Sequence, residues 1–147
     1  MNKLLAKLAI IYMALALTGG FFYREYTKYA EFKGFTTLSI LHTHYFVLGM
    51  FFFLIMLALE DRFHFLGSKL GHIGLIVYNI FLNVTVIMMI VRGVVQVGGT
   101  ELAKGPNAAI SGMAGLGHIG LTAGLVLILV ALYQAVGAGQ DRSVKQA

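Results

Sequence analysis

Four long apolar runs, separated by short polar segments, dominate the pattern of hydrophobic and polar positions along the chain. The runs cover residues 4–22, 38–59, 70–97 and 108–137. Each is long enough for an α-helix to cross the hydrocarbon core of a bilayer. Charged residues lie mainly between the runs or at their ends. The pattern predicts an all-α integral membrane four-helix bundle, formed as a single domain by residues 1–147.

Two of the polar segments have patterns of their own. Before the second run, aromatic residues recur at every third position among charged ones, which is typical of a short interfacial helix that anchors a bundle. These residues are Tyr23, Tyr26, Tyr29, Phe32 and Phe35. A lid over a bound ligand is the alternative role. Before the fourth run, glycines and the only proline predict a turn, after which Asn107 is placed to cap the helix.

The composition agrees with a membrane protein. Hydrophobic residues make up 59% of the chain and charged residues only 12%, so no soluble domain of useful size remains outside the runs. The net charge is +5, but the basic residues are scattered at the ends of the runs, so we expect contact with lipid headgroups and no nucleic-acid partner. An even number of spans puts both termini on one side, and the Lys and Arg distribution favours the cytoplasmic side.

Histidines and one arginine lie inside the apolar runs, where such side chains are costly unless they are bound. At ~1.5 Å rise per residue, His44 lies roughly 10 Å, Arg92 roughly 8 Å and His118 roughly 15 Å below the outer ends of their runs. Three polar side chains from three spans thus share a similar depth, whereas His72 lies at the opposite end. The chain has no cysteine, which excludes disulfides and covalent c-type haem attachment and leaves histidine as the main soft nitrogen ligand.

These residues suit a haem site. A b-type haem in a helical bundle needs axial imidazoles, room for a flat ring and a partner for its propionates. Ala114 and Gly115 lie about one turn before His118 and leave a trough in which a macrocycle fits, although the same small residues suit close helix packing. Arg92 can pair with a propionate through its planar guanidinium, or it can extend to the outer headgroups.

His42 and His44 compete for the role of second ligand. They are two residues apart, which turns them about 200° from each other on a helix, so they cannot both bind one iron from a regular helix. His44 is deeper and shares its face with apolar side chains, whereas His42 suits a hydrated position at the interface. We expect His44 and His118 to be the axial ligands, and the choice between His42 and His44 stays open.

The third run also carries polar residues that must face the bundle or a partner subunit. Interhelical hydrogen bonding is their expected role, and a proton or water path is the alternative. These residues are Tyr78, Asn79, Asn83, Thr85, Arg92 and Gln96. In the fourth run, Gly120 and Gly124 form a GxxxG pattern that suits close packing of helices.

Four segments carry a resemblance to known proteins. They are Tyr23–Phe35, Leu41-His-Thr-His-Tyr-Phe-Val-Leu-Gly-Met50, Met89-Ile-Val-Arg-Gly93 with Gln96, and Ala108-Ala-Ile-Ser-Gly-Met-Ala-Gly-Leu-Gly-His118. Over most of its length the chain resembles a family of small bacterial four-helix membrane proteins known only as a domain of unknown function. It is also similar, more distantly, to haem-copper oxidase subunit I-like membrane haem proteins. That second resemblance implies haem ligation by His118 and one of His42 or His44. The chain departs from those proteins because it has only four spans and no histidine cluster for a copper centre, so oxygen reduction is not expected.

Together these observations predict a membrane-embedded b-type haem-binding protein of the bacterial cytoplasmic (inner) membrane, working in electron transfer or in redox or gas sensing. Two axial imidazoles favour electron transfer, and a single one leaves a position for a diatomic gas. The expected partners are the lipid bilayer, a second copy in a homodimer, and a redox partner or quinone. No catalytic constellation is present, so enzymatic turnover is left open. The alternatives are a copper or zinc carrier and a packing or transport subunit whose histidines form only interhelical hydrogen bonds.

Overall fold

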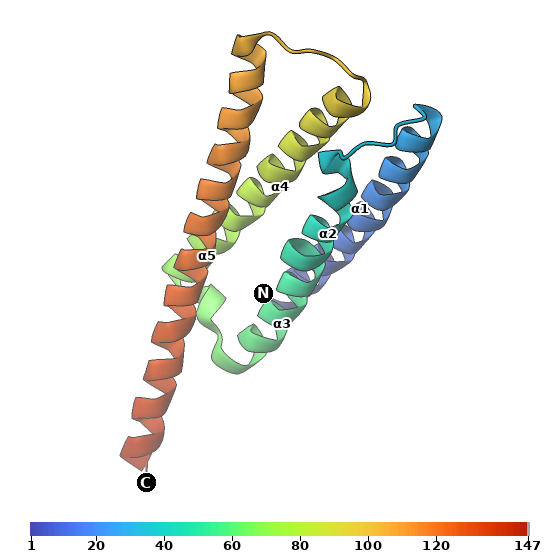
Figure 1. Cartoon of the computed structure of the whole chain (residues 1–147). Helices are drawn as coiled ribbons and strands as arrows, with labels where there is room; N and C mark the ends of the chain where they lie inside the picture. Colours follow the sequence, from blue (N-terminus) through green and yellow to red (C-terminus); the bar gives the residue numbers. More distant parts are fainter. Residues whose placement is uncertain (147) are drawn as a thin grey trace.

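The structure is a computed structural model that describes the backbone of residues 1–146 and the side chains of residues 1–138. Within these residues it is helical, without a β-strand (Figure 1). Four helical spans are long and apolar enough to cross a membrane, which confirms the predicted all-α architecture and is compatible with a multi-pass membrane protein. The elements in chain order are α1 (Asn2–Tyr29), the 3₁₀ turn η1 (Thr37–Ile40), α2 (Leu41–His44), the π-helix η2 (Tyr45–Phe51), α3 (Phe52–Phe63), the 3₁₀ turn η3 (Phe65–Gly67), α4 (Lys69–Val97) and α5 (Lys104–Gln146).

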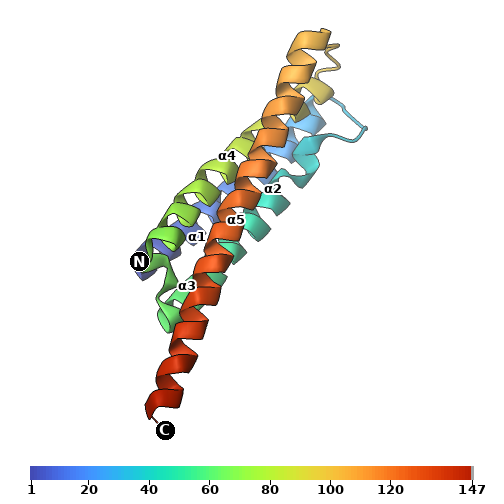
Figure 2. The ribbon, with the colours of Figure 1, turned by 90° about the vertical axis from the view of Figure 1, so that its left-hand side faces the viewer.

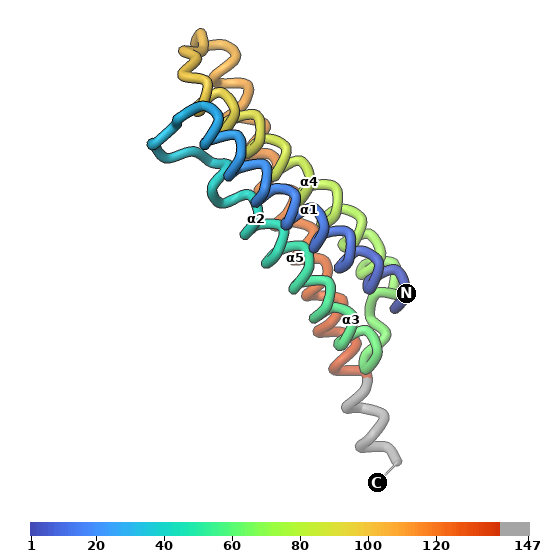
Figure 3. Tube along the Cα trace, turned by 90° about the vertical axis from the view of Figure 1, so that its right-hand side faces the viewer, coloured from blue at the N-terminus to red at the C-terminus, as the bar shows by residue number. Residues whose placement is uncertain are grey.

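The four spans form two neighbouring pairs. α1 lies beside the second span, which runs from η1 through α2 and η2 to α3 (Figure 3), and α4 packs against α5 (Figures 1 and 2). In Figure 1, α4 runs between α5 on one side and α2 on the other. The Asn2 side chain donates a 3.1 Å hydrogen bond to Asp61 of α3. The chain therefore starts at the end of the molecule where the second span finishes, as expected for antiparallel neighbours.

The first span is longer than the apolar pattern predicted. Residues 23–29 continue α1 and residues 30–36 are not helical, so the prediction of a separate interfacial helix is wrong. No glycine or proline interrupts the chain directly after Phe22, and α1 ends only just before Glu31, which adopts a left-handed backbone with a φ of 50°. The aromatic rings near this end pair with each other, because Phe22 and Tyr26 stack with centroids 5.4 Å apart.

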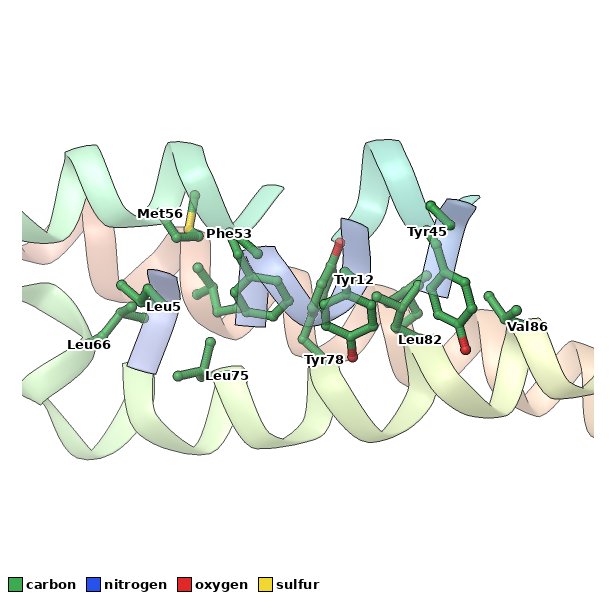
Figure 4. Close-up of a cluster of buried hydrophobic side chains, with 14 of the residues drawn as sticks. Leu5, Tyr12, Tyr45, Phe53, Met56, Leu66, Leu75, Tyr78, Leu82 and Val86 are labelled. Carbon is green, nitrogen blue, oxygen red and sulfur yellow. The ribbon is translucent and has the colours of Figure 1, made fainter. Parts of the chain in front are cut away.

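Large apolar and aromatic side chains fill the space between the spans (Figure 4). Tyr12 of α1 stacks on Phe53 of α3 with ring centroids 5.4 Å apart. Phe52 of α3 stacks on Tyr78 of α4 with centroids 4.0 Å apart. Because lipid tails are as apolar as this core, close packing and interhelical hydrogen bonds, rather than escape from water, must hold membrane helices together.

A chain of hydrogen bonds links three spans inside the bundle. The hydroxyl of Tyr12 donates to Oδ1 of Asn79 at 2.6 Å and accepts from Nδ2 of Asn83 at 2.7 Å. The hydroxyl of Tyr45 in η2 donates to Oδ1 of Asn83 at 3.2 Å. The interhelical hydrogen bonding predicted for the polar residues of α4 is therefore confirmed for Asn79 and Asn83.

The π-helix η2 keeps one face of the second span in the core. Leu41, Tyr45, Gly49 and Phe53 are all buried, although residues at a repeated four-residue spacing drift around a regular α-helix. The wider turn of a π-helix cancels this drift, because its hydrogen bonds reach one residue further along the chain. It therefore keeps Leu41 of α2 and Phe53 of α3 on the same buried face, and His44 lies directly before η2.

Replacing Tyr78 with phenylalanine should destabilise the protein by about 1 kcal/mol, because the carbonyl of Leu48 in η2 would lose a hydroxyl donor that lies 2.8 Å away. Thermal unfolding of the detergent-purified protein measures the change. The matched control is Tyr133→Phe, which removes a hydroxyl from a side chain that is 81% exposed and should leave the unfolding temperature unchanged. Equal shifts in the two variants would show that the Tyr78 hydroxyl does not stabilise η2.

Candidate functional site

Two histidines on different spans are held in the same way. Nδ1 of His44, at the end of α2, lies 3.0 Å from the carbonyl oxygen of Ile40, and Nδ1 of His118, in α5, lies 2.8 Å from the carbonyl oxygen of Ala114. A carbonyl oxygen only accepts, so each Nδ1 carries a hydrogen and donates it. When the Nδ1 atom of an uncharged imidazole carries the hydrogen, its Nε2 atom keeps a lone pair. This is the tautomer in which an imidazole binds a metal through Nε2.

Both histidines line one cavity between the two helix pairs. It has a volume of about 400 Å³, within the usual size range of small-molecule sites. The wall is mostly apolar and comes from η1, α2, α4 and α5. Its residues are Thr37, Ile40, His44, Met88, Met89, Arg92, Ile110, Ser111, Ala114 and His118. The structure thus brings together His44, Arg92, Ala114 and His118, which the sequence predicted as site residues.

Close packing of α5 on α4 sets the position of His118. A Cβ atom on Gly117 would lie 3.1 Å from the backbone nitrogen of Thr85, and one on Gly124 would lie 2.5 Å from the backbone nitrogen of Tyr78. The backbones of the two helices therefore approach closely at both glycines. The predicted GxxxG pattern is confirmed as a backbone contact at Gly124, whereas a Cβ atom on its other member, Gly120, would meet the ring of Phe81. His118 directly follows Gly117 and is itself exposed at the side of the cavity.

Arg92 ties α4 to the first turns of α5. Its guanidinium donates to Oδ1 of Asn107, and its Nη2 atom donates to Oγ of Ser111 at 2.7 Å. The prediction that Asn107 caps the helix is wrong, because α5 already begins at Lys104 and the Asn107 side chain accepts from Arg92. Among the described residues no carboxylate lies within 4.0 Å of Arg92, so its charge has no ionic partner there.

Two predicted site residues lie outside the cavity. His42 faces α1, where a Cβ atom on Gly20 would lie 3.6 Å from its Cβ, and its buried Nδ1 atom has no hydrogen-bond partner among the described residues. Nothing lies within 4 Å of the Cβ position of Gly115, which faces away from the bundle. Successive residues of an α-helix are rotated by about 100°. His42 is therefore about 200° from His44, and Gly115 is about 100° from Ala114, which lines the cavity.

A second cavity, of about 440 Å³, lies directly beyond Arg92, where α4 ends and α5 begins. We call it the outer cavity, and the first cavity the inner cavity. Arg92 belongs to the walls of both cavities. The other lining residues of this outer cavity are Val95, Gln96, Gly99, Thr100, Glu101, Leu102 and Asn107. Sequence reasoning did not assign Gln96, Thr100 or Asn107 to a binding site, and only their polar character next to a span end was available as a signal.

Among residues whose side chains are described, no group of three or more histidines and carboxylates is placed to hold a metal ion. A copper or zinc carrier with such a ligand set therefore has no site in this part of the chain. A haem iron needs only one or two axial ligands from the protein, because the porphyrin supplies the other four. His44 and His118 are the two histidines in the wall of the first cavity.

The model of one protein family, described as "Protein of unknown function (DUF2871)", matches residues 1–135. No curated protein and no solved structure matches the chain. The chemistry of the site must therefore be judged from its own residues.

Proposed function

We propose that this chain, which belongs to the DUF2871 family of proteins of unknown function, is a membrane-embedded b-type haem-binding protein. Its work would be electron transfer, or redox or gas sensing. One observation carries the proposal: His44 and His118, from different spans, line one apolar cavity with their Nδ1 atoms held by backbone carbonyls. This arrangement leaves two Nε2 atoms as the ligands that an iron porphyrin requires.

The remaining wall of the cavity fits the same group. Ile40, Met88 and Ile110 offer apolar surface to a flat ring and keep water away from it. Arg92 can pair with a propionate, since its guanidinium has no carboxylate partner among the described residues. When bound, haem b supplies an iron that exchanges one electron or, with a free axial position, binds a diatomic gas.

We further propose that the four spans lie in the bacterial cytoplasmic membrane with both termini in the cytoplasm. The loops that follow α1 and α4 would then face outward. We also propose that the protein forms a homodimer and that its partner in electron transfer is a redox protein or a quinone. A detergent-corrected mass equal to a single 16.0 kDa chain would exclude the dimer.

An absorption spectrum of the detergent-purified protein tests the haem proposal. We expect a Soret band, split α and β bands after reduction, and iron in equal amount to bound haem. The matched control is His72→Ala, which removes an exposed histidine near the start of α4, away from the cavity, and should leave the spectrum unchanged. A protein that has no Soret band and does not take up added haem would contradict the proposal, and copper or zinc in its place would favour a metal carrier.

One observation favours a packing subunit as the second candidate. The hydrogen bonds from Arg92 to Asn107 and Ser111 join α4 to α5 without any ligand. On this hypothesis the histidines have no ligand role, and neither haem nor a metal ion would copurify. The interhelical hydrogen bonds expected for the histidines of a packing subunit are not what their Nδ1 atoms form, because those of His44 and His118 bond to carbonyls of their own spans. The same spectrum and metal content separate the two functions.

A further inference from the structure

Two amide side chains line the outer cavity, the half-buried Gln96 and the exposed Asn107, and each has N–H donors without an acceptor among the described residues. Oε1 of Gln96 accepts from the backbone nitrogen of Thr37 at 2.9 Å, so its Nε2 atom is left as a free pair of N–H donors. Oδ1 of Asn107 accepts from Arg92, so its Nδ2 atom is left in the same way. Neither amide nitrogen has an acceptor among the described residues. Because each amide oxygen faces a donor, the two amides cannot be turned to offer oxygen to the cavity instead.

The positive charge of Arg92 in the wall of the outer cavity also favours a ligand group that accepts hydrogen bonds. Arg92 has five N–H donors, and its contacts with Asn107 and Ser111 use three of them. The one acidic residue in the wall, Glu101, is exposed and forms no ion pair with Arg92 within 4.0 Å. A wall with a guanidinium and two amide nitrogens, all donors, favours a ligand group that only accepts hydrogen bonds and carries negative charge.

The two cavities meet at Arg92 and differ in chemistry. The inner one is apolar apart from its histidines, Thr37 and Ser111, whereas the outer one offers Gln96, Thr100 and Asn107. Together they match a ligand with a large apolar body and an acidic end. A porphyrin with two propionates has this shape and charge.

We propose that the outer cavity binds the carboxylate end of the ligand whose ring occupies the inner cavity, with Gln96 and Asn107 as specificity-determining residues beside Arg92. This inference rests on the proposed haem function and adds the orientation of the ring to it. The propionates point toward the outer end of α4, and the ring edge that carries no carboxylate points toward the middle of the bundle. The phosphate of an anionic lipid headgroup is the other source of the same chemistry.

Metal-free protoporphyrin and its dimethyl ester test this orientation, because neither needs an axial ligand. We expect the wild-type protein in zwitterionic nanodiscs to bind the free acid about tenfold more tightly than the ester, measured by porphyrin fluorescence. In Gln96→Glu the oxygen that accepts from Thr37 is kept, but the donors are replaced by a negative charge. This variant should bind the free acid about tenfold more weakly and the ester unchanged. Asn107→Asp likewise keeps the oxygen that accepts from Arg92 and replaces the amide donors by a negative charge. It should also bind the free acid about tenfold more weakly and the ester unchanged.

The matched control is Gln134→Glu, an exposed glutamine of α5 outside both cavities, which should change neither affinity. Equal affinity of wild-type protein for acid and ester, or no effect of either cavity variant in folded protein, would overturn the inference. If that happened while haem still gave a histidine-ligated spectrum, the proposed function would stand and only the orientation would fall. Anionic lipid is then added to the nanodiscs. If it bound at Gln96 and Asn107 and the porphyrin did not, the lipid headgroup would be the occupant of the outer cavity and the proposed orientation would be wrong.

Discussion

Replacing either His44 or His118 with alanine should convert a six-coordinate low-spin haem into a five-coordinate form and weaken haem binding on the order of 100-fold. Each imidazole is oriented by one hydrogen bond within its own span, from Nδ1 of His44 to the carbonyl of Ile40 and from Nδ1 of His118 to the carbonyl of Ala114. No other histidine lines the cavity, so no neighbouring imidazole within the described residues can replace the lost one. A free axial position should also allow added carbon monoxide to bind the reduced variants.

Electron paramagnetic resonance of the ferric proteins measures this change, because low-spin and high-spin iron give distinct signals. His42→Ala is the matched control: the residue lies two positions from His44 but faces Gly20 of α1, so the low-spin signal should persist. If His42→Ala lost the low-spin signal and His44→Ala kept it, His42 and not His44 would be the axial ligand.

Replacing Gly124 with leucine should separate α5 from α4 and destabilise the protein by about 3 kcal/mol. A Cβ atom at this position would lie 2.5 Å from the backbone nitrogen of Tyr78 and 2.7 Å from its Cα atom. Backbone atoms cannot rotate away as a flexible side chain can, so the whole helix must move. Because His118 lies on the same helix, the movement should also weaken haem binding.

Thermal unfolding and haem titration in the same detergent measure both effects. Gly112→Leu provides the matched control, since nothing lies within 4 Å of the Cβ position of Gly112 and the new side chain would project into open space. It should change the unfolding temperature little. A Gly124→Leu protein as stable as Gly112→Leu would mean that the close approach of α4 and α5 does not exist.

Much of the architecture could be predicted from the sequence, because membrane spans are defined by the length and polarity of continuous apolar runs. The third run, 70–97, agrees with α4 to within one residue at its start. The ends of the first and fourth runs were less well defined. Residues 23–29 are polar and aromatic, yet they continue α1, since backbone hydrogen bonding does not require apolar side chains.

The depth of the site residues was predictable for a similar reason. A fixed rise per residue placed His44, Arg92 and His118 at a similar level, and the structure has all three in one cavity wall. Their direction around each helix was not predictable to the same degree. Gly115 and Ala114 are neighbours in the sequence, but only Ala114 lines the cavity, because the packing of Gly117 and Gly124 on α4 sets the rotation of α5.

Two features had no usable signal in the sequence. The π-helix η2 arises where Tyr45 and Gly49 must both face the core, and such a local widening of a helix depends on partners in other spans. The outer cavity depends on hydrogen bonds between distant residues, such as the one from Thr37 to Gln96, which decide whether an amide presents its oxygen or its nitrogen.

Titration of haem into the wild-type protein and into the double variant His44→Ala/His118→Ala, followed by absorption in the Soret region, tests the central claim most directly. The claim is that imidazoles from α2 and α5 bind one iron across the inner cavity. We predict a saturable, low-spin haem spectrum for the wild-type protein and no ligated haem in the folded double variant. The same saturable low-spin spectrum in both proteins, or no uptake of haem by either, would contradict it.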